Sequence, residues 1–151
     1  MKKEDYSKIS KVHNLPQYNE LNRDFNIENI EEEDFLLVRI CRKITEKIET
    51  IVKLLEDILY PTTSLTGLYE SKYIEDRDKE KIYKIFKQLV RYLRYSSEVS
   101  FSDNEQENAV FVNEFYKDWQ KLKPELQIIF SRLKKSWDTE SSIKEDLSYL
   151  G

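Results

Sequence analysis

Apolar residues recur at steps of three and four along three long segments of the chain, and this period predicts amphipathic helices. The first segment follows Asn29 and ends before Pro61, and Asn29 has capping-box spacing with Glu32. Its apolar stripe consists of Leu37, Cys41, Ile44, Ile48, Ile51, Leu55 and Ile58. Because this stripe is uninterrupted, we expect this helix to be the central element of the fold.

Two further stripes predict two more long helices. One helix begins near Asp76 and fades at Ser96, and its stripe consists of Ile82, Ile85, Phe86, Leu89 and Leu93. The other follows Asp103, which has capping-box spacing with Gln106, and its stripe consists of Val112, Phe115, Trp119, Leu122, Leu126, Ile129 and Leu133. This stripe keeps its phase across Pro124, which predicts one kinked helix or two nearly collinear helices.

Shorter elements are expected at the two ends of the chain. Residues 1–28 are mostly polar and are expected to form an N-terminal arm, with a short helix from Pro16 to Asp24. Ser142 and Glu145 have capping-box spacing and predict a short C-terminal helix. The patterns together predict an all-α fold, an antiparallel bundle of three long helices with short terminal helices, in which residues 29–151 form one domain.

Composition excludes several classes of protein. Among 151 residues there are only two glycines, Gly67 and Gly151, which excludes glycine-rich phosphate loops and dinucleotide fingerprints. One histidine and one cysteine exclude an intrachain disulfide and a cysteine-rich zinc site, and no partners surround the histidine for a catalytic triad. We therefore expect no cofactor.

The single histidine and cysteine are both expected to be inert. His13 lies in a polar segment and is expected to be a surface residue. Cys41 lies on an apolar stripe, where a thiol behaves as a small buried hydrophobic group. No stretch resembles a signal peptide or a membrane span, so we expect a cytoplasmic protein without a membrane partner.

The formal net charge of −4 conceals a basic helix face. The segment from Lys81 to Ser97 contains no acidic residue, and at about 100° per residue four of its five cations share one sector opposite the apolar stripe. The residues concerned are Lys84, Lys87, Arg91 and Arg94, with Tyr83, Tyr92 and Tyr95 on or beside them. Basic residues interleaved with aromatic rings are typical of surfaces that bind nucleic acid or another polyanion.

The acidic residues that follow offer an alternative, because a neighbouring helix that carries them would neutralise the basic face within the molecule. These residues are Glu98, Asp103, Glu105, Glu107, Glu114 and Asp118. Besides nucleic acid and the acidic residues of the same chain, an acidic protein is a third possible partner for this face.

Four carboxylates are the remaining candidates for a catalytic or metal-binding site. Glu46 and Glu49, then Glu75 and Asp78, form ExxE and ExxD pairs separated by 25 residues. This spacing is similar to the acidic signature of the all-α nucleoside triphosphate pyrophosphatases. The resemblance implies that the four carboxylates hold Mg²⁺ against the substrate's phosphates. The helix angle, however, directs Glu46 and Glu49 away from the apolar stripe.

Three functional hypotheses follow. The first is a non-enzymatic protein-interaction subunit or adaptor, because long apolar stripes suit contacts between helices and no complete catalytic constellation is present. Its partner would be another protein or a second copy of this chain. The second is a small helical component of a nucleic-acid-handling complex that uses the basic helix face. The third is a Mg²⁺-dependent enzyme like the pyrophosphatases.

Overall fold

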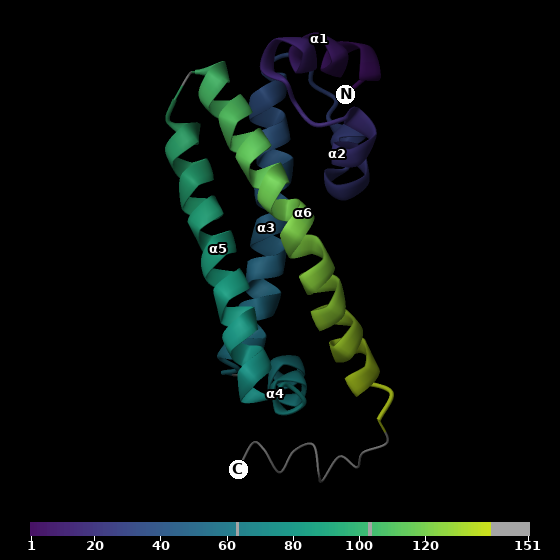
Figure 1. Cartoon of the computed structure of the whole chain (residues 1–151), viewed down its shortest axis with the longest axis vertical. Helices are drawn as coiled ribbons and strands as arrows, with labels where there is room; N and C mark the ends of the chain where they lie inside the picture. Colours follow the sequence, from purple (N-terminus) through teal and green to yellow (C-terminus); the bar gives the residue numbers. More distant parts are fainter. Residues whose placement is uncertain (63, 103, 140–151) are drawn as a thin grey trace. The chain divides into compact units, whose positions relative to one another are not determined.

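The computed structural model describes residues 1–62, 64–102 and 104–139. The elements are α1 (Lys3–His13), α2 (Tyr18–Phe25), the 3-10 helix η1 (Ile27–Asn29), α3 (Leu36–Leu59), α4 (Leu65–Lys72), α5 (Asp76–Ser100) and α6 (Glu105–Ser136) (Figure 1). These described residues contain helices and no strand, which confirms the all-α class. The helix predicted near Ser142 lies outside the described residues.

The chain divides into two compact units. Unit 1 consists of Met1–Thr50 and Val90–Gln120, and unit 2 consists of Ile51–Leu89 and Lys121–Gly151. Helices α3, α5 and α6 each contribute one part to each unit. The N-terminal residues, for which the sequence predicts an arm, form α1, α2 and η1 and belong to unit 1.

Helix α3 buries the predicted stripe but begins later than the sequence indicates. All seven residues of the stripe from Leu37 to Ile58 are buried, and Pro61 follows the end of the helix. The predicted cap at Asn29 is wrong, because Asn29 is the last residue of η1. The side-chain oxygen of Asn22 accepts a hydrogen bond from the Glu28 backbone N–H at 2.8 Å, and this bond stabilises the turn.

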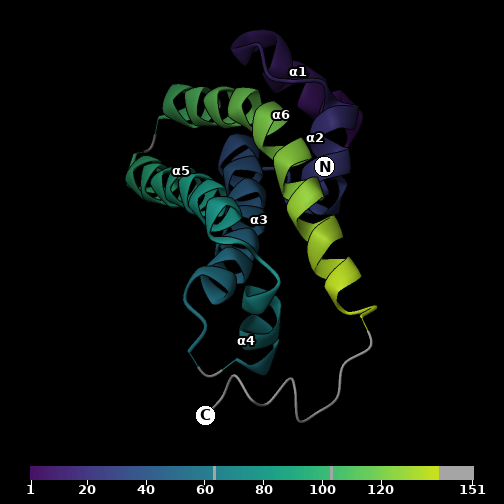
Figure 2. The ribbon, with the colours of Figure 1, turned by 60° about the horizontal axis from the view of Figure 1, so that its bottom comes forward.

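The N-terminal segment packs against α6 within unit 1. Helix α2 buries Leu21 and Phe25, and it overlaps the predicted short helix but begins two residues later and ends one residue later. The Phe25 ring centroid lies 5.8 Å from that of Phe115 and 5.5 Å from that of Trp119. Figures 1 and 2 show α2 alongside α6. Helix α1, which the sequence analysis did not predict, buries only Tyr6.

Helix α6 is one helix that contains Pro124 and is not divided into two helices there. Pro124 is exposed, and its missing hydrogen bond therefore faces water rather than the core. The predicted cap at Asp103 lies outside the described residues. Immediately before the helix, the side-chain oxygen of Asn104 accepts a hydrogen bond from the Gln106 backbone N–H at 2.9 Å.

Within unit 1, α5 and α6 are antiparallel neighbours. Tyr95 packs edge-on against Phe111 at 5.3 Å, and Tyr92 packs against Phe115 at 5.1 Å. The residue numbers of these contacting pairs fall along α5 as they rise along α6, so the two helices run in opposite directions. Helix α3 reaches α6 through the Cys41 thiol, which lies 3.6 Å from the Asn108 carbonyl oxygen.

Unit 2 contains the short helix α4, which the sequence analysis did not predict. Helix α4 begins at Leu65, and the Ser64 hydroxyl caps it by accepting a hydrogen bond from the Gly67 N–H at 3.1 Å. Farther along α4, Tyr69 donates a hydrogen bond to the Ser136 carbonyl at 2.7 Å and stacks on Trp137 at 4.1 Å. These contacts attach α4 to the end of α6.

We expect Asp24→Ala to lower the free energy of unfolding by about 2 kcal/mol, because the buried Trp119 indole N–H then loses its acceptor. In the structure this N–H donates to Asp24 Oδ2 at 2.9 Å. Urea unfolding followed by circular dichroism measures the loss. Asp24→Asn retains an acceptor oxygen and should lose less. Equal losses for Asp24→Ala and Arg23→Ala would contradict this prediction, because Arg23 only pairs with Asp24 from an exposed position.

Gly67→Ala should also destabilise the protein, by about 1–3 kcal/mol, because the core must shift to accept a methyl group. A Cβ at this position would lie 2.7 Å from the Asp57 backbone carbonyl oxygen. Thermal unfolding measures the effect. The matched control is Thr66→Ala on the exposed side of α4, which should be neutral or stabilising. A stabilised Gly67→Ala protein would show that α4 does not pack closely on α3 within unit 2.

Candidate binding surface on helix α5

Helix α5 buries residues at a seven-residue spacing, and this determines which side faces solvent. Ile82 and Leu89 are buried, as are Ile85, Tyr92 and Val99 at the same interval. A straight α-helix drifts by about 20° for each heptad, so the buried face turns gradually along the helix. The predicted stripe members Phe86 and Leu93 are accordingly only partly buried.

The four predicted cations of α5 are all exposed, and we call them the α5 basic face: Lys84, Lys87, Arg91 and Arg94. Lys84 and Lys87 belong to unit 2, and Arg91 and Arg94 belong to unit 1. None of the four forms an ion pair with an acidic residue of the described chain. Their charges are therefore available to an external partner.

An exposed aromatic ring accompanies the two lysines in unit 2. Tyr83 is 52% exposed, and the Lys87 ammonium lies 5.6 Å from its ring centroid. Tyr83 also stacks on Phe86 at 6.4 Å between ring centroids. The ring is thus held in place while one face of it remains close to a cation.

The two arginines in unit 1 line a shallow groove of about 400 Å³. Arg91, Arg94, Tyr95, Glu98 and Glu114 form its walls. Partial burial raises the pKa of the Tyr95 phenol, and the negative charges of Glu114 and Glu98 raise it further. Sequence reasoning considered Glu114 only as part of an acidic run, because its approach to α5 depends on the antiparallel pairing with α6.

The expectation that Tyr92 lies on the basic face is wrong. Its side chain is 2% exposed, and its hydroxyl donates to Asp118 Oδ2 at 2.7 Å. Burial and this hydrogen bond raise the pKa of the Tyr92 phenol well above its ordinary value. Only the Arg91 guanidinium, 5.5 Å from the ring centroid, connects Tyr92 with the basic face. Tyr92 is a core residue, and Tyr95 is the partly exposed ring beside the two arginines.

The acidic residues proposed to neutralise the basic face have several different positions. Glu98 and Glu114 line the groove beside the arginines without forming ion pairs with them. Asp118 accepts the hydrogen bond from Tyr92, and Glu107 accepts one from the Asn104 side chain at 3.5 Å. Asp103 lies outside the described residues.

His13 is not the simple surface residue that the sequence suggested. Its side chain is only 10% exposed, and its Nδ1 lies 3.2 Å from the side-chain oxygen of Gln106. Its backbone carbonyl accepts a hydrogen bond from Asn113 at 3.2 Å, and its Nε2 lies 3.9 Å from Glu105. His13 therefore attaches the end of α1 to the beginning of α6. Sequence reasoning missed this role because His13 and Asn113 are 100 positions apart in the chain.

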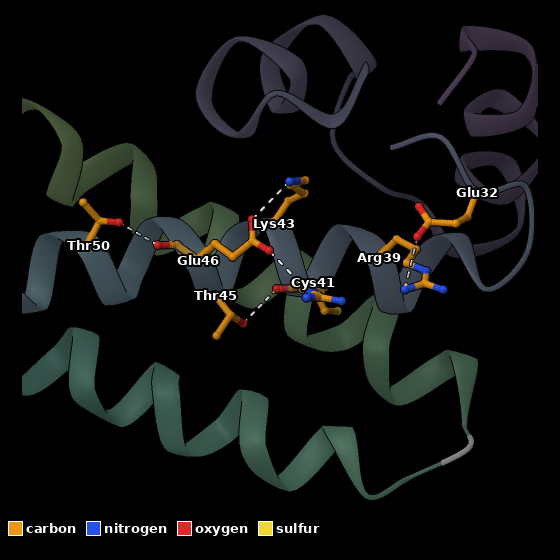
Figure 3. A network of polar contacts seen from close by, with 8 residues as sticks. Glu32, Arg39, Cys41, Lys43, Thr45, Glu46 and Thr50 are labelled. Carbon is orange, nitrogen blue, oxygen red and sulfur yellow. Dashed lines mark hydrogen bonds and ion pairs between the residues drawn. The ribbon is translucent and has the colours of Figure 1, made fainter. Parts of the chain in front are cut away.

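The four carboxylates of the possible magnesium site have other neighbours. Glu46 pairs with Lys43 at 3.1 Å and with Arg42 at 3.3 Å on the exposed side of α3 (Figure 3). Asp78 accepts a hydrogen bond from Arg132 at 2.7 Å. Glu49 and Glu75 are exposed. Within the described ranges, no three His, Cys, Asp or Glu side chains are grouped so that they could hold a metal ion.

Comparison with protein-family models, with curated proteins and with solved structures finds no match. A search of the described helices likewise identifies none with the length and apolarity needed to span a bilayer. Functional inference for this chain therefore depends on its own residues.

We expect the Cys41 thiol to react very slowly with Ellman's reagent at pH 8. Burial raises the pKa of this thiol to about 12 from 9.0, which lowers the thiolate fraction about a thousandfold. The contribution of the protonated, buried thiol to stability is fully present below about pH 9. It is lost as the pH rises from about 9 towards 12, because the raised pKa makes the unfolded chain release this proton first. The absorbance of the released thiolate measures the rate. Urea-unfolded protein is the control, and similar rates in the folded and unfolded protein would contradict the burial of Cys41.

Proposed function

We propose that this protein is a non-enzymatic helical interaction subunit or adaptor, and that its α5 basic face binds an acidic surface of a partner protein. One observation carries the proposal. Four cations on one helix are exposed and form no ion pair with the described acidic residues. Carboxylates of a partner would provide opposite charges to these cations, which favours encounter and fixes the register of binding.

The surroundings of the two arginines favour a protein over a nucleic acid. Glu98 and Glu114 lie in the same groove as Arg91 and Arg94, and the whole chain is acidic. A nucleic acid presents a continuous line of phosphates, which would meet these two carboxylates unfavourably. A protein partner can place separate carboxylates against the arginines and neutral side chains against Glu98 and Glu114.

The proposal includes an arrangement of the long helices. Within unit 1, α5 and α6 are antiparallel neighbours. We propose that α3, α5 and α6 form an antiparallel three-helix bundle and that the protein acts in the cytoplasm. The partner is then another protein, or the acidic surface of a second copy of this chain.

Nucleic-acid binding is the second candidate function, and one observation favours it. Tyr83 is half exposed and lies beside the exposed Lys84 and Lys87. An exposed ring next to cations is the combination that stacks a base while the ammonium groups contact phosphates.

Charge reversal of the basic face tests both candidates. We expect Arg91→Glu combined with Arg94→Glu to weaken binding of a fluorescent 20-residue glutamate-rich helical peptide by at least about tenfold, because attraction becomes repulsion. Fluorescence anisotropy at low and moderate salt measures the affinity. Lys47→Glu combined with Lys53→Glu is the control, since both are exposed lysines of α3 and the change in net charge is equal.

A 20-base-pair DNA duplex and a single-stranded RNA of equal length are measured in parallel. Tight, salt-dependent binding of either nucleic acid without peptide binding would replace the first candidate with the second. No binding of any probe, or equal weakening by the control pair, would contradict both candidates. Light scattering of the unmodified and charge-reversed proteins then shows whether the partner is a second copy of the chain.

A further inference from the structure

A groove of about 540 Å³, lined by both apolar and polar side chains, lies between α1 and the beginning of α2. It lies within unit 1 and is separate from the α5 basic face. The groove is widely open to solvent. The groove owes its form to the turn between the helices, in which the Tyr6 hydroxyl donates to the Pro16 carbonyl and the Ser10 hydroxyl donates to the Leu15 carbonyl at 3.3 Å.

Helix α1 supplies cations and neutral polar groups to one wall of the groove. Lys3, Ser7 and Lys11 follow each other at steps of four, so they lie along one side of α1, and Asn14 follows the helix with a left-handed backbone at φ 50°. All four are exposed. Neither Lys3 nor Lys11 forms an ion pair with an acidic residue in the described part of the chain.

The opposite wall comes from the first residues of α2 and the residue before it. Gln17 and Asn19 expose amide side chains, which can both donate and accept hydrogen bonds. Between them, Tyr18 is held by a hydrogen bond from its hydroxyl to the Met1 carbonyl at 3.0 Å and by edge-on packing against Tyr6 at 5.4 Å. The Lys3 ammonium lies 5.6 Å from the Tyr18 ring centroid.

The lining contains no acidic residue, although 29 of the 151 residues in the chain are Asp or Glu. Asp5 on α1 is outside the groove, where it accepts a hydrogen bond from Lys8 at 2.9 Å. Burial raises the pKa of the Tyr6 and Tyr18 phenols, and the charges of Glu20 and Glu28, which lie outside the lining, raise the pKa of Tyr6 and of Tyr18 respectively further. The lining itself carries two lysine cations and several neutral hydrogen-bonding groups. An anionic ligand with many hydroxyl groups matches both properties.

We propose that this groove binds a small sugar phosphate. Lys3 and Lys11 contact phosphate oxygens as point charges, and their Cα atoms are about 12 Å apart along the helix axis, which favours a ligand with a phosphate at each end. The Ser7 hydroxyl and the amides of Asn14 and Asn19 contact sugar hydroxyl groups. This proposal does not depend on the function of the α5 basic face.

Amide chemical shifts of the full ¹⁵N-labelled chain test the proposal. The probes are fructose 1,6-bisphosphate, glucose 6-phosphate, inorganic phosphate and glucose. We expect the affinity to decrease in that order, with shifts concentrated at Ser7, Asn14 and Asn19. Lys3→Gln combined with Lys11→Gln should weaken bisphosphate binding at least about tenfold, because both charged contacts are lost. Lys8→Gln, an exposed lysine of the same helix outside the groove, is the matched control.

The double variant Ser7→Ala with Asn19→Ala tests the proposed contacts of uncharged side chains with the sugar hydroxyl groups. We expect this pair to weaken binding of glucose 6-phosphate and to leave binding of inorganic phosphate unchanged. Circular dichroism confirms that each variant keeps its helix content. The proposal is overturned if 10 mM bisphosphate shifts no groove amide, if the shifts cluster at Arg91 and Arg94, or if Lys8→Gln weakens binding as much as the groove variants.

Discussion

Unit 1 depends on three aromatic rings of α6, those of Phe111, Phe115 and Trp119, which lie one helical turn apart. Consecutive ring centroids are 6.3 and 5.7 Å apart, and rings from α2 and α5 pack against this row. Aromatic pairs contribute about 0.5–1.5 kcal/mol each beyond the burial of their surface. The row ends in an indole N–H that requires an acceptor, and Asp24 supplies it. The N-terminal segment is therefore part of the core rather than an appendage.

The same aromatic row determines how α5 presents its charges. Within unit 1, Tyr92 packs on Phe115 and its hydroxyl donates to Asp118, so this side of α5 faces the core while Arg91 and Arg94 face solvent. A helical wheel predicted the exposure of the cations, since each lies opposite an apolar stripe. It misplaced Tyr92, because the seven-residue spacing of burial turns the buried face along the helix. Tyrosine is amphipathic and occurs both in cores and at surfaces, so the residue type alone did not indicate that Tyr92 is buried.

The sequence predicted the helices best where apolar residues repeat over several turns, as in α3 and α6. It failed where local hydrogen bonds compete with the helix. Before α3, the Asn22 side chain stabilises a 3-10 turn and Phe35 adopts a positive φ of 55°, so the capping pattern at Asn29 is not used. Helix α1 has one buried residue, and its contact with α6 joins residues about 100 positions apart in the chain. The groove beside it depends on the turn before α2, which no periodic pattern encodes.

Neither compact unit is a contiguous stretch of chain, because each is assembled from separate parts of α3, α5 and α6. No single cut in the gene therefore releases one unit intact, and neither unit can be exchanged between proteins as a cassette. An insertion or deletion inside one of these shared helices rotates every later residue of that helix by about 100° for each residue gained or lost. We therefore expect changes in chain length to be tolerated in the turns between helices rather than inside the long helices.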